Sequence, residues 1–152
     1  MRDTPKTREY FRHFCPITTR WADNDVYGHV NNVVYYLWFD TVVNEFLIAN
    51  GTLDIHAGDR IGLVIESHCN YFSPVAFPEP VTAGLCVARL GNSSVRYEVG
   101  IFRGDENIAS AQGHFVHVYV DRTTRKSVSI PAATRALLNS IQLPSSTSPE
   151  SA

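Results

Sequence analysis

Residues 33–48 read VVYYLWFDTVVNEFLI. Apolar side chains recur in this stretch at i, i+4, i+7, i+8 and i+11, which is the period of an α-helix. These positions are Tyr35, Phe39, Val42, Val43 and Phe46. Four more apolar side chains extend the surface round most of the helix, namely Tyr36, Leu37, Trp38 and Leu47. Because a helix that is apolar nearly all round is buried nearly all round, we expect this segment to form the centre of the domain.

A dense polar stretch, RWADNDVYGHVNN (residues 20–32), directly precedes this helix. Asn31 or Asn32 can cap the first turn of the helix with a side-chain oxygen. Asn50 and Gly51 supply the left-handed conformation that ends a helix. The aspartates at positions 23 and 25 can form Asx turns. An ordinary helix cap therefore accounts for much of the stretch, and any chemical role must be weighed against that structural one.

After residue 51 the apolar pattern changes to period two, which is typical of β-strands. We expect strands at residues 14–21, 61–72, 80–90, 94–103 and 108–121, and a short helix at residues 131–140. One strand, one buried helix and then four strands in a row favour an α+β fold with a single curved antiparallel sheet around the helix. One helix covers only part of such a sheet, so we also expect dimerisation.

Composition and charge narrow the classes of function. The chain has 152 residues, the size of one domain, and a formal net charge of -2. Without a basic run, we expect no nucleic-acid partner. The three cysteines, Cys15, Cys69 and Cys86, form neither a disulfide framework nor a zinc motif. The first residues lack the apolar core of a signal peptide and no segment is apolar enough to span a bilayer, so we expect a cytoplasmic protein without membrane insertion.

Two metal-binding interpretations fail on spacing. Residues 23–28 resemble the start of a calcium loop, but Tyr27 and Val34 stand where that loop needs an oxygen ligand and a glutamate. His114 and His117 lie three residues apart in an expected strand, so their side chains point to opposite faces. We therefore expect no metal, and no other cofactor is implied.

The chemistry that remains is a carboxylate placed just before a helix N-terminus. The free N–H groups of a first helical turn carry a partial positive charge and can hold an oxyanion. Each such donor contributes roughly 10²–10³ in rate. An aspartate is ordinarily ionised at pH 7, so it can attack a carbonyl or deprotonate a water. Because a thiolate leaves readily, this pair suffices for a thioester but hardly for an amide.

The run RWADNDVYGHVNNVVYYLWFD (residues 20–40) resembles the hotdog-fold acyl-CoA thioesterases of the 4-hydroxybenzoyl-CoA thioesterase type. Their pattern is a strand, then D-x-D-x-x-G-H-V-N-N or a relative, then the central helix. The later stretches VIESHCNYFSPV (residues 64–75) and GHFVHVYVD (residues 113–121) fit less specifically. The resemblance covers roughly residues 14–130. It implies a five-stranded antiparallel sheet wrapped around one long helix, in homodimers or homotetramers with active sites at the dimer interface.

The resemblance also implies roles for single residues. Asp25 matches the catalytic carboxylate, as nucleophile or general base, and the backbone N–H of Asn32 matches the oxyanion donor. The expected substrate-binding residues are Gly28, His29, Asn31 and Tyr36. Asp23 matches a loop-ordering aspartate. Some relatives carry the catalytic acid on the helix, where this chain has Asp40 and Glu45, and Glu66 on the next strand is a further candidate carboxylate.

The sequence thus predicts one hotdog domain over residues 14–143, after an extension of residues 1–13 and before a Pro/Ser-rich tail of residues 144–152 that we expect to be disordered. The expected function is hydrolysis of an acyl-CoA to a free acid and CoA. Two alternatives stay open, because a shared fold does not settle chemistry. One is a hydratase or dehydratase of acyl thioesters that uses His29 beside Asp25. The other is a non-catalytic acyl-CoA-binding dimer.

Overall fold

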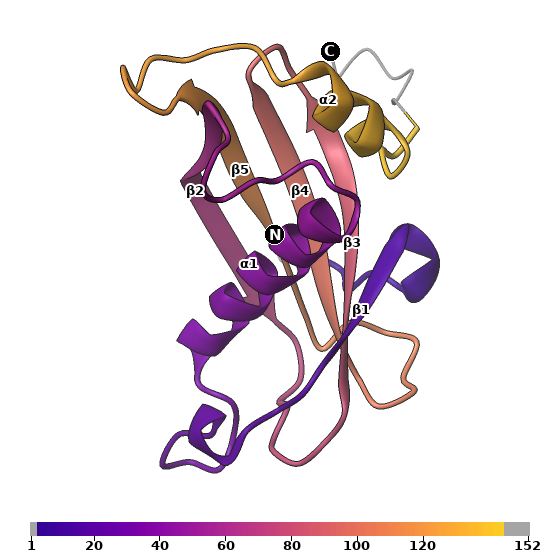
Figure 1. The fold of residues 1–152 in the computed structure, drawn as a ribbon. Helices are drawn as coiled ribbons and strands as arrows, with labels where there is room; N and C mark the ends of the chain where they lie inside the picture. The colour runs from indigo at the N-terminus through magenta and orange to yellow at the C-terminus, as the bar shows by residue number, and fades with distance from the viewer. Residues whose placement is uncertain (1–2, 145–152) are drawn as a thin grey trace.

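The computed structural model describes residues 3–144, which form one antiparallel sheet of five strands with a long helix lying across it (Figure 1). The strands are β1 (His13–Ile17), β2 (Arg60–Tyr71), β3 (Val81–Leu90), β4 (Ser94–Arg103) and β5 (Ala111–Asp121). Their order in the sheet is β1-β3-β4-β5-β2. The helices are α1 (Asn32–Ala49) and α2 (Ala132–Asn139), with short 3-10 helices η1 (Arg8–Tyr10) and η2 (Trp21–Asp23). The α+β hotdog fold expected from the sequence is confirmed.

The α1 helix is held by side chains that enter the concave side of the sheet. Phe39, Val42 and Val43 are completely buried. The Phe39 ring meets Phe115 of β5 edge to face, with 5.7 Å between ring centroids. Each fully buried side chain of this size contributes roughly 1.5–3 kcal/mol. This burial fixes where the helix begins, and so fixes the position of the polar stretch that precedes it.

One side of α1 is not covered, which differs from the expectation of burial nearly all round. Val33, Leu37 and Ile48 are 64%, 53% and 49% exposed. The sheet is a single layer and reaches only one side of the helix, so apolar residues on the other side remain at the surface. The spacing of the apolar residues identifies a helix, but it does not show how many layers of structure cover that helix.

Both ends of α1 are where the sequence places them. Asn31 is the N-cap, and its Oδ1 accepts a hydrogen bond from the Val33 N–H at 3.1 Å. At the C-terminus, Gly51 has φ +73°, in the left-handed region that favours glycine. The end of the first strand was predicted wrongly, because β1 stops at Ile17 and residue 21 already starts η2. The last strand likewise begins at Ala111, three residues later than predicted.

Residues 3–12 run along the sheet face opposite α1. The Lys6 N–H donates to Gln112 Oε1 at 2.7 Å, and Gln112 Nε2 donates to the Thr4 carbonyl at 3.0 Å. Phe11 lies flat on the sheet above Gly100, where an added Cβ would meet the Phe11 ring at 2.6 Å. The segment is therefore packed as part of the folded protein. No helix within residues 3–144 has the length and apolarity needed to cross a membrane. The predicted tail lies, apart from its first residue, outside the described residues.

Candidate active site

The loop before α1 is closed by Asp23. This side chain is 1% exposed, and its carboxylate accepts hydrogen bonds from the Arg20 backbone N–H at 2.8 Å and from the Arg20 guanidinium at 2.8 and 3.0 Å. The Asp23 carbonyl also accepts from the Asn31 N–H at 2.9 Å. Asp23 thus ties the beginning of the loop to the helix cap, and its carboxylate is fully engaged in structure.

Asp25 stands at a tight turn within this loop. Its N–H donates to the His29 carbonyl at 2.8 Å, and its carbonyl accepts from the Gly28 N–H at 3.1 Å. Gly28 has φ +85°, which a side chain would disfavour. Asp25 Oδ1 accepts from the Tyr27 N–H at 2.9 Å. Within residues 3–144 the other carboxylate oxygen, Oδ2, has no hydrogen-bond partner, so the turn holds the carboxylate by one oxygen and leaves the other free.

Asn32 is the first residue of α1 and presents an unpaired backbone N–H. The N–H groups of its neighbours are engaged: Asn31 donates to Asp23, and Val33 and Val34 donate to Asn31. No acceptor for the Asn32 N–H exists in the described part of the chain. An N–H of this kind, at the positive end of the helix dipole, is suited to a partial negative charge.

Asp25 and Asn32 line the same hollow, which has a volume of about 350 Å³. We call it the smaller hollow; the rest of its lining is His29, Val30, Tyr35, Tyr71, Phe72, Ser73 and Pro74. The Tyr71 hydroxyl donates to the Asn32 carbonyl at 3.1 Å. The end of β2 and the start of α1 therefore meet at one place, with a carboxylate, an imidazole and a free N–H around a wall of aromatic rings.

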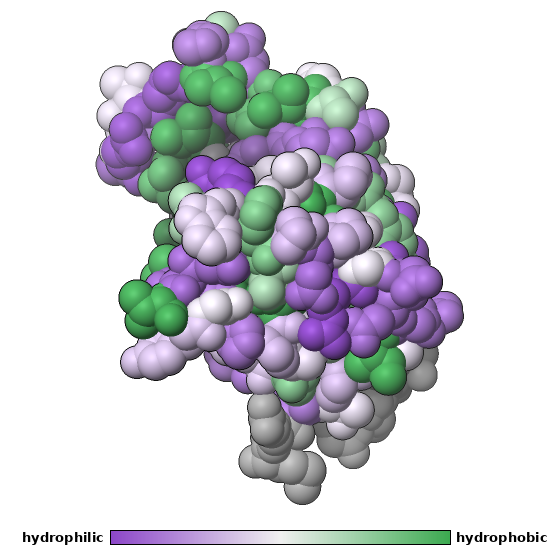
Figure 2. Space-filling model, turned by 90° about the horizontal axis from the view of Figure 1, so that it is seen from below, coloured by the Kyte–Doolittle hydropathy of each residue, from purple (hydrophilic) through white to green (hydrophobic). Residues whose placement is uncertain are grey.

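A second hollow, of about 760 Å³, adjoins the first and also includes Asp25. We call it the larger hollow; its other lining residues are Trp21, Asn24, Val26, Tyr27, Gly28 and Asn31. Figure 2 looks onto the lower end of the molecule in Figure 1, where apolar side chains reach the surface among polar ones. Asp25 is the one residue that the two hollows share.

The structure brings most of the predicted site residues to these hollows. Asp25, His29 and Asn32 line the smaller one, and Gly28 and Asn31 line the larger one. Tyr36 lines neither; its ring packs edge to face on Phe39, with 5.9 Å between centroids.

Tyr35, the residue before Tyr36, lines the smaller hollow instead. Tyr71, which sequence reasoning did not single out, lines it as well. Period two in β2 could place Tyr71 on the helix side of the sheet, but nothing in the sequence pairs it with Asn32.

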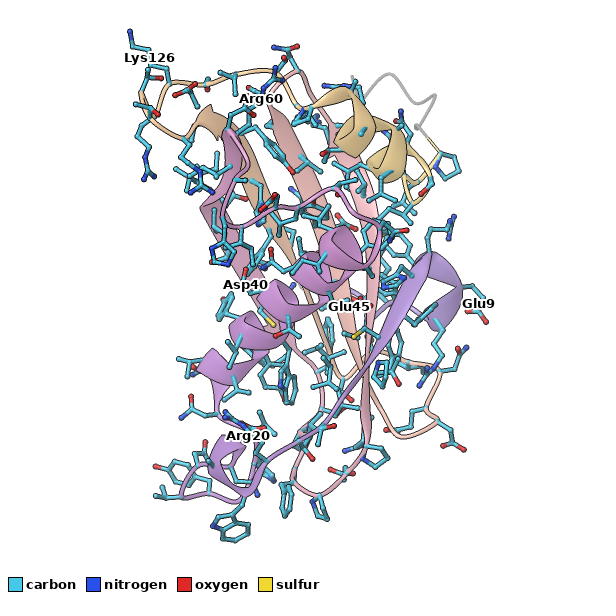
Figure 3. All side chains as sticks on the ribbon, in the orientation of Figure 1. Glu9, Arg20, Asp40, Glu45, Arg60 and Lys126 are labelled. Carbon is cyan, nitrogen blue, oxygen red and sulfur yellow. The ribbon has the colours of Figure 1, made fainter. Side chains whose placement is uncertain are left out.

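The other candidate carboxylates lie outside both hollows. Asp40 and Glu45 lie on α1, and the loop that carries Arg20 comes before the helix (Figure 3). Asp40 accepts a hydrogen bond from Asn44 at 3.2 Å, and Glu45 pairs with His13 at 2.9 Å. Glu66 contacts His114 at 2.5 Å.

The HxxH pair is split between the two sheet faces, as predicted. His117 is buried with its ring against Tyr97 and Phe115, whereas His114 contacts Glu66 and stacks on His68. In the described residues no group of three or more histidine, cysteine or acidic side chains is placed to hold a metal ion.

The cysteines do not provide a competing nucleophile. Burial raises the pKa of Cys69, beside Tyr71, to about 11, and raises that of Cys86 to about 12. Burial also raises the pKa of Cys15. Since the thiolate is the reactive form, these thiols are protonated and unreactive near neutral pH.

Comparison with solved structures places the fold among known proteins. The PA5185 protein from Pseudomonas aeruginosa strain PAO1 is 54% identical, with a TM-score of 0.89 over 91% of this chain and 96% of that one. PA2801 from Pseudomonas aeruginosa, a candidate thioesterase, is 29% identical, with a TM-score of 0.75 over 82% of this chain and 95% of that one. The BH1999 gentisyl-coenzyme A thioesterase shares the fold at 22% identity, with a TM-score of 0.73 over 83% and 99% of the two chains.

No curated protein matches the chain. The family model of the thioesterase-like superfamily matches residues 19–138, which include the whole polar stretch, α1 and all strands from β2 to β5. The chain therefore belongs to the thioesterase-like superfamily.

Proposed function

We propose that the protein is an acyl-CoA thioesterase, which hydrolyses an acyl-CoA to a free acid and CoA. The observation that carries the proposal is the smaller hollow, which Asp25 and Asn32 both line. Each has a polar group without a hydrogen-bond partner within residues 3–144, namely Oδ2 of Asp25 and the N–H of Asn32. The superfamily match, and the CoA thioesters named for the structural neighbour BH1999, support the choice of substrate class.

The chemistry follows from these two groups. The thioester carbonyl oxygen accepts a hydrogen bond from the Asn32 N–H, which stabilises the negative charge that develops there. Asp25 either attacks the carbonyl carbon, giving an anhydride that water hydrolyses, or takes a proton from a water that attacks in its place. In both routes the C–S bond breaks and the CoA sulfur leaves as a thiolate, which takes up a proton from solvent.

We also propose that the protein works as a homodimer or a higher homo-oligomer. Among the described residues the β2 strand pairs only with β5, so its other edge is open in this part of the chain. Leu63, Val64 and Ile65 on this strand are 38%, 48% and 63% exposed. An open edge with adjacent apolar side chains is costly in water and favours pairing with a second copy.

The test is thiol release from short, long and aromatic acyl-CoAs by the native protein and by Asp25→Asn. This change keeps the shape of the side chain and removes its charge, so we expect folding to persist and turnover to fall by roughly 10²–10⁴. Asp40→Asn is the matched control, because it makes the same change on an exposed carboxylate outside the hollows. Equal turnover by native protein and Asp25→Asn would contradict the proposed role of Asp25.

A hydratase acting on acyl thioesters is the second candidate, since His29 lines the same hollow as Asp25. Such an enzyme typically pairs a histidine with an acid. Between the His29 and Asp25 side chains no hydrogen bond is formed in the described structure, which favours hydrolysis. Loss of enoyl-CoA absorbance without thiol release would identify the hydratase. Binding of acyl-CoA without either reaction would identify a non-catalytic binder.

A further inference from the structure

Arg103, the last residue of β4, makes contacts that the chemistry derived above does not use. Its Nη1 donates a hydrogen bond to the Pro74 carbonyl at 2.6 Å. Its Nε and Nη2 donate to the Glu106 carboxylate at 2.6 and 3.2 Å, and Glu79 Oε2 lies 3.7 Å from Nε. The rigid fork of a guanidinium can hold a carbonyl and a carboxylate in one fixed arrangement. Because Arg103 lines neither hollow, it can act on the site only through its neighbours.

Pro74 belongs to the segment that connects β2 to β3, and it forms part of the wall of the smaller hollow. The two residues before it, Phe72 and Ser73, are fixed by their N–H groups, which donate to the Ser110 carbonyl at 2.8 and 3.1 Å. Proline has no N–H to donate, so only its carbonyl can fix its backbone by a hydrogen bond. Arg103 supplies the donor to that carbonyl, and the wall of the hollow is therefore tied to β4.

The next residue, Val75, is completely buried and joins this segment to the loop before α1. Its carbonyl accepts a hydrogen bond from the Val30 N–H at 2.7 Å. Val30 directly follows His29, whose carbonyl accepts from the Asp25 N–H at 2.8 Å. Val30 also comes two residues before Asn32. A shift of Val75 would therefore change how the Asp25 carboxylate and the Asn32 N–H are placed relative to each other.

Tyr35 gives further evidence that Arg103 and Val75 lie close to the smaller hollow. Burial raises the pKa of Tyr35 to about 12, and nearby Cys69 adds to the rise. The Val75 N–H and the positive charge of Arg103 oppose this rise, so both lie near the Tyr35 hydroxyl. The Tyr35 ring is 3% exposed and meets Tyr71 edge to face, with 5.0 Å between centroids. Arg103 thus lies near the aromatic wall of the hollow without lining it.

We propose that Arg103 is a positioning residue for the hydrolysis, which fixes the Pro74–Val75 segment and, through it, the loop that carries Asp25. This arrangement keeps the Asp25 carboxylate and the Asn32 N–H aligned on one carbonyl group. The inference rests on the proposed thioester hydrolysis. Arg103 contributes to alignment and not to substrate binding, and rates are sensitive to misplacements of reacting groups on the scale of 1 Å.

Steady-state kinetics with the acyl-CoA that the native protein cleaves best tests this role. Arg103→Met keeps the length of the side chain and removes its donors, so kcat should fall roughly 10–100-fold. KM should change by less than about twofold, because no group that contacts the substrate is lost. Arg103→Lys can still donate one hydrogen bond to the Pro74 carbonyl, and it should recover part of kcat.

Arg122 offers a matched control. Its Nε and Nη2 donate to the backbone carbonyls of Gly58 and Ile55 at 2.7 and 2.6 Å, in the segment between α1 and β2. None of these three residues lines either hollow. Arg122→Met also loses arginine–carbonyl hydrogen bonds, so its midpoint in urea should fall about as far as that of Arg103→Met. Its kcat should stay native.

Amide hydrogen exchange followed by NMR gives a readout that does not depend on turnover. In Arg103→Met the Val30 N–H should exchange about tenfold faster, because its acceptor on Val75 is no longer fixed. In Arg122→Met this exchange should stay native. Glu106→Gln removes the charge that orients the guanidinium and keeps Arg103 itself, so it should change kcat and exchange in the same direction but less. This milder variant carries the test if Arg103→Met does not fold.

Equal losses of kcat in Arg103→Met and Arg122→Met would overturn the inference, because the effect would then be one of global stability. A higher KM at unchanged kcat, or unchanged exchange of the Val30 N–H in Arg103→Met, would overturn it as well. The proposed hydrolysis fails separately, if the native protein releases no thiol from any acyl-CoA or if Asp25→Asn is as active as the native protein. In that case the exchange of the Val30 N–H still decides whether Arg103 fixes the loop.

Discussion

The Tyr71 hydroxyl donates a hydrogen bond to the backbone carbonyl of Asn32 at 3.1 Å, joining the last residue of β2 to the first residue of α1. The contact spans 39 positions of sequence. Burial, followed by the effect of nearby Cys69, raises the pKa of Tyr71, so its hydroxyl is a neutral donor near neutral pH. Tyr71 is therefore a positioning residue for the helical turn whose free N–H we propose as the oxyanion donor.

Tyr71→Phe should lower kcat about two- to tenfold, which is the usual net value of one hydrogen bond. The phenylalanine ring keeps the edge-to-face contact with Tyr35, so KM should change little. Steady-state kinetics with one acyl-CoA checks both values. Tyr97→Phe is the control, because the Tyr97 hydroxyl is buried without a hydrogen-bond partner in the described structure. A higher KM at unchanged kcat would show that Tyr71 binds substrate and does not position the helix.

Most of the fold could be predicted because its signals are local. The period-two segments at residues 80–90 and 94–103 match β3 and β4 closely, since each strand has one face on the core. The end of β1 was missed because Arg20 and Asp23 close a loop through side-chain hydrogen bonds, and alternation of residue types does not report such bonds. The exposed side of α1 was missed for another reason. Its apolar residues Val33 and Leu37 have no layer over them in residues 3–144 of the chain.

The candidate site was likewise predicted only in part. Asp25, Gly28 and Asn32 fall within eight consecutive residues, so a turn and a helix cap bring them together and their spacing can be recognised. Tyr71 comes from another element. Its contact with Asn32 depends on the register of β2 against β5 and on the angle of α1 across the sheet, which only the folded chain determines.

Asp23→Ala should destabilise the protein by about 2 kcal/mol, because it removes a buried carboxylate that accepts three hydrogen bonds from Arg20. The expected result is a lower midpoint in urea with an unchanged slope. Asp105→Ala, in an exposed turn, should leave the midpoint where it is. If the two variants unfold at the same urea concentration, the bonds from Arg20 do not stabilise the loop.

His117 should make stability depend on pH. Burial lowers its pKa below the ordinary value of 6.5, and the Asp40 carboxylate opposes this only in part. Tyr97 and Phe115 face its ring, and Nε2 has no partner within the described residues. As pH falls below about 6.5, the unfolded chain takes up a proton that the folded protein does not. The free energy of unfolding should therefore decrease as the pH decreases, by at most about 1.4 kcal/mol per pH unit.

Thermal denaturation between pH 7.5 and pH 5 measures this dependence. His117→Phe keeps an aromatic ring among the same neighbours. In this variant the stability should decrease less as the pH is lowered. His56→Gln changes an exposed histidine in the loop after α1 and should retain it. The same slope in the native protein and in His117→Phe would assign the pH dependence to other groups.

The open edge of β2 leads to a prediction about assembly. Ile65 is 63% exposed on this strand, and we propose that a second copy covers it. Ile65→Lys places a charge in that interface, and a lysine on an edge strand opposes pairing. Sedimentation velocity should show a shift from dimer to monomer at micromolar concentration. Ile108→Lys makes the same change on a residue that is 58% exposed outside β2, and this variant should remain a dimer. A dimeric Ile65→Lys protein with full activity would mean that the chains associate through another surface, for which the uncovered side of α1 is the next candidate.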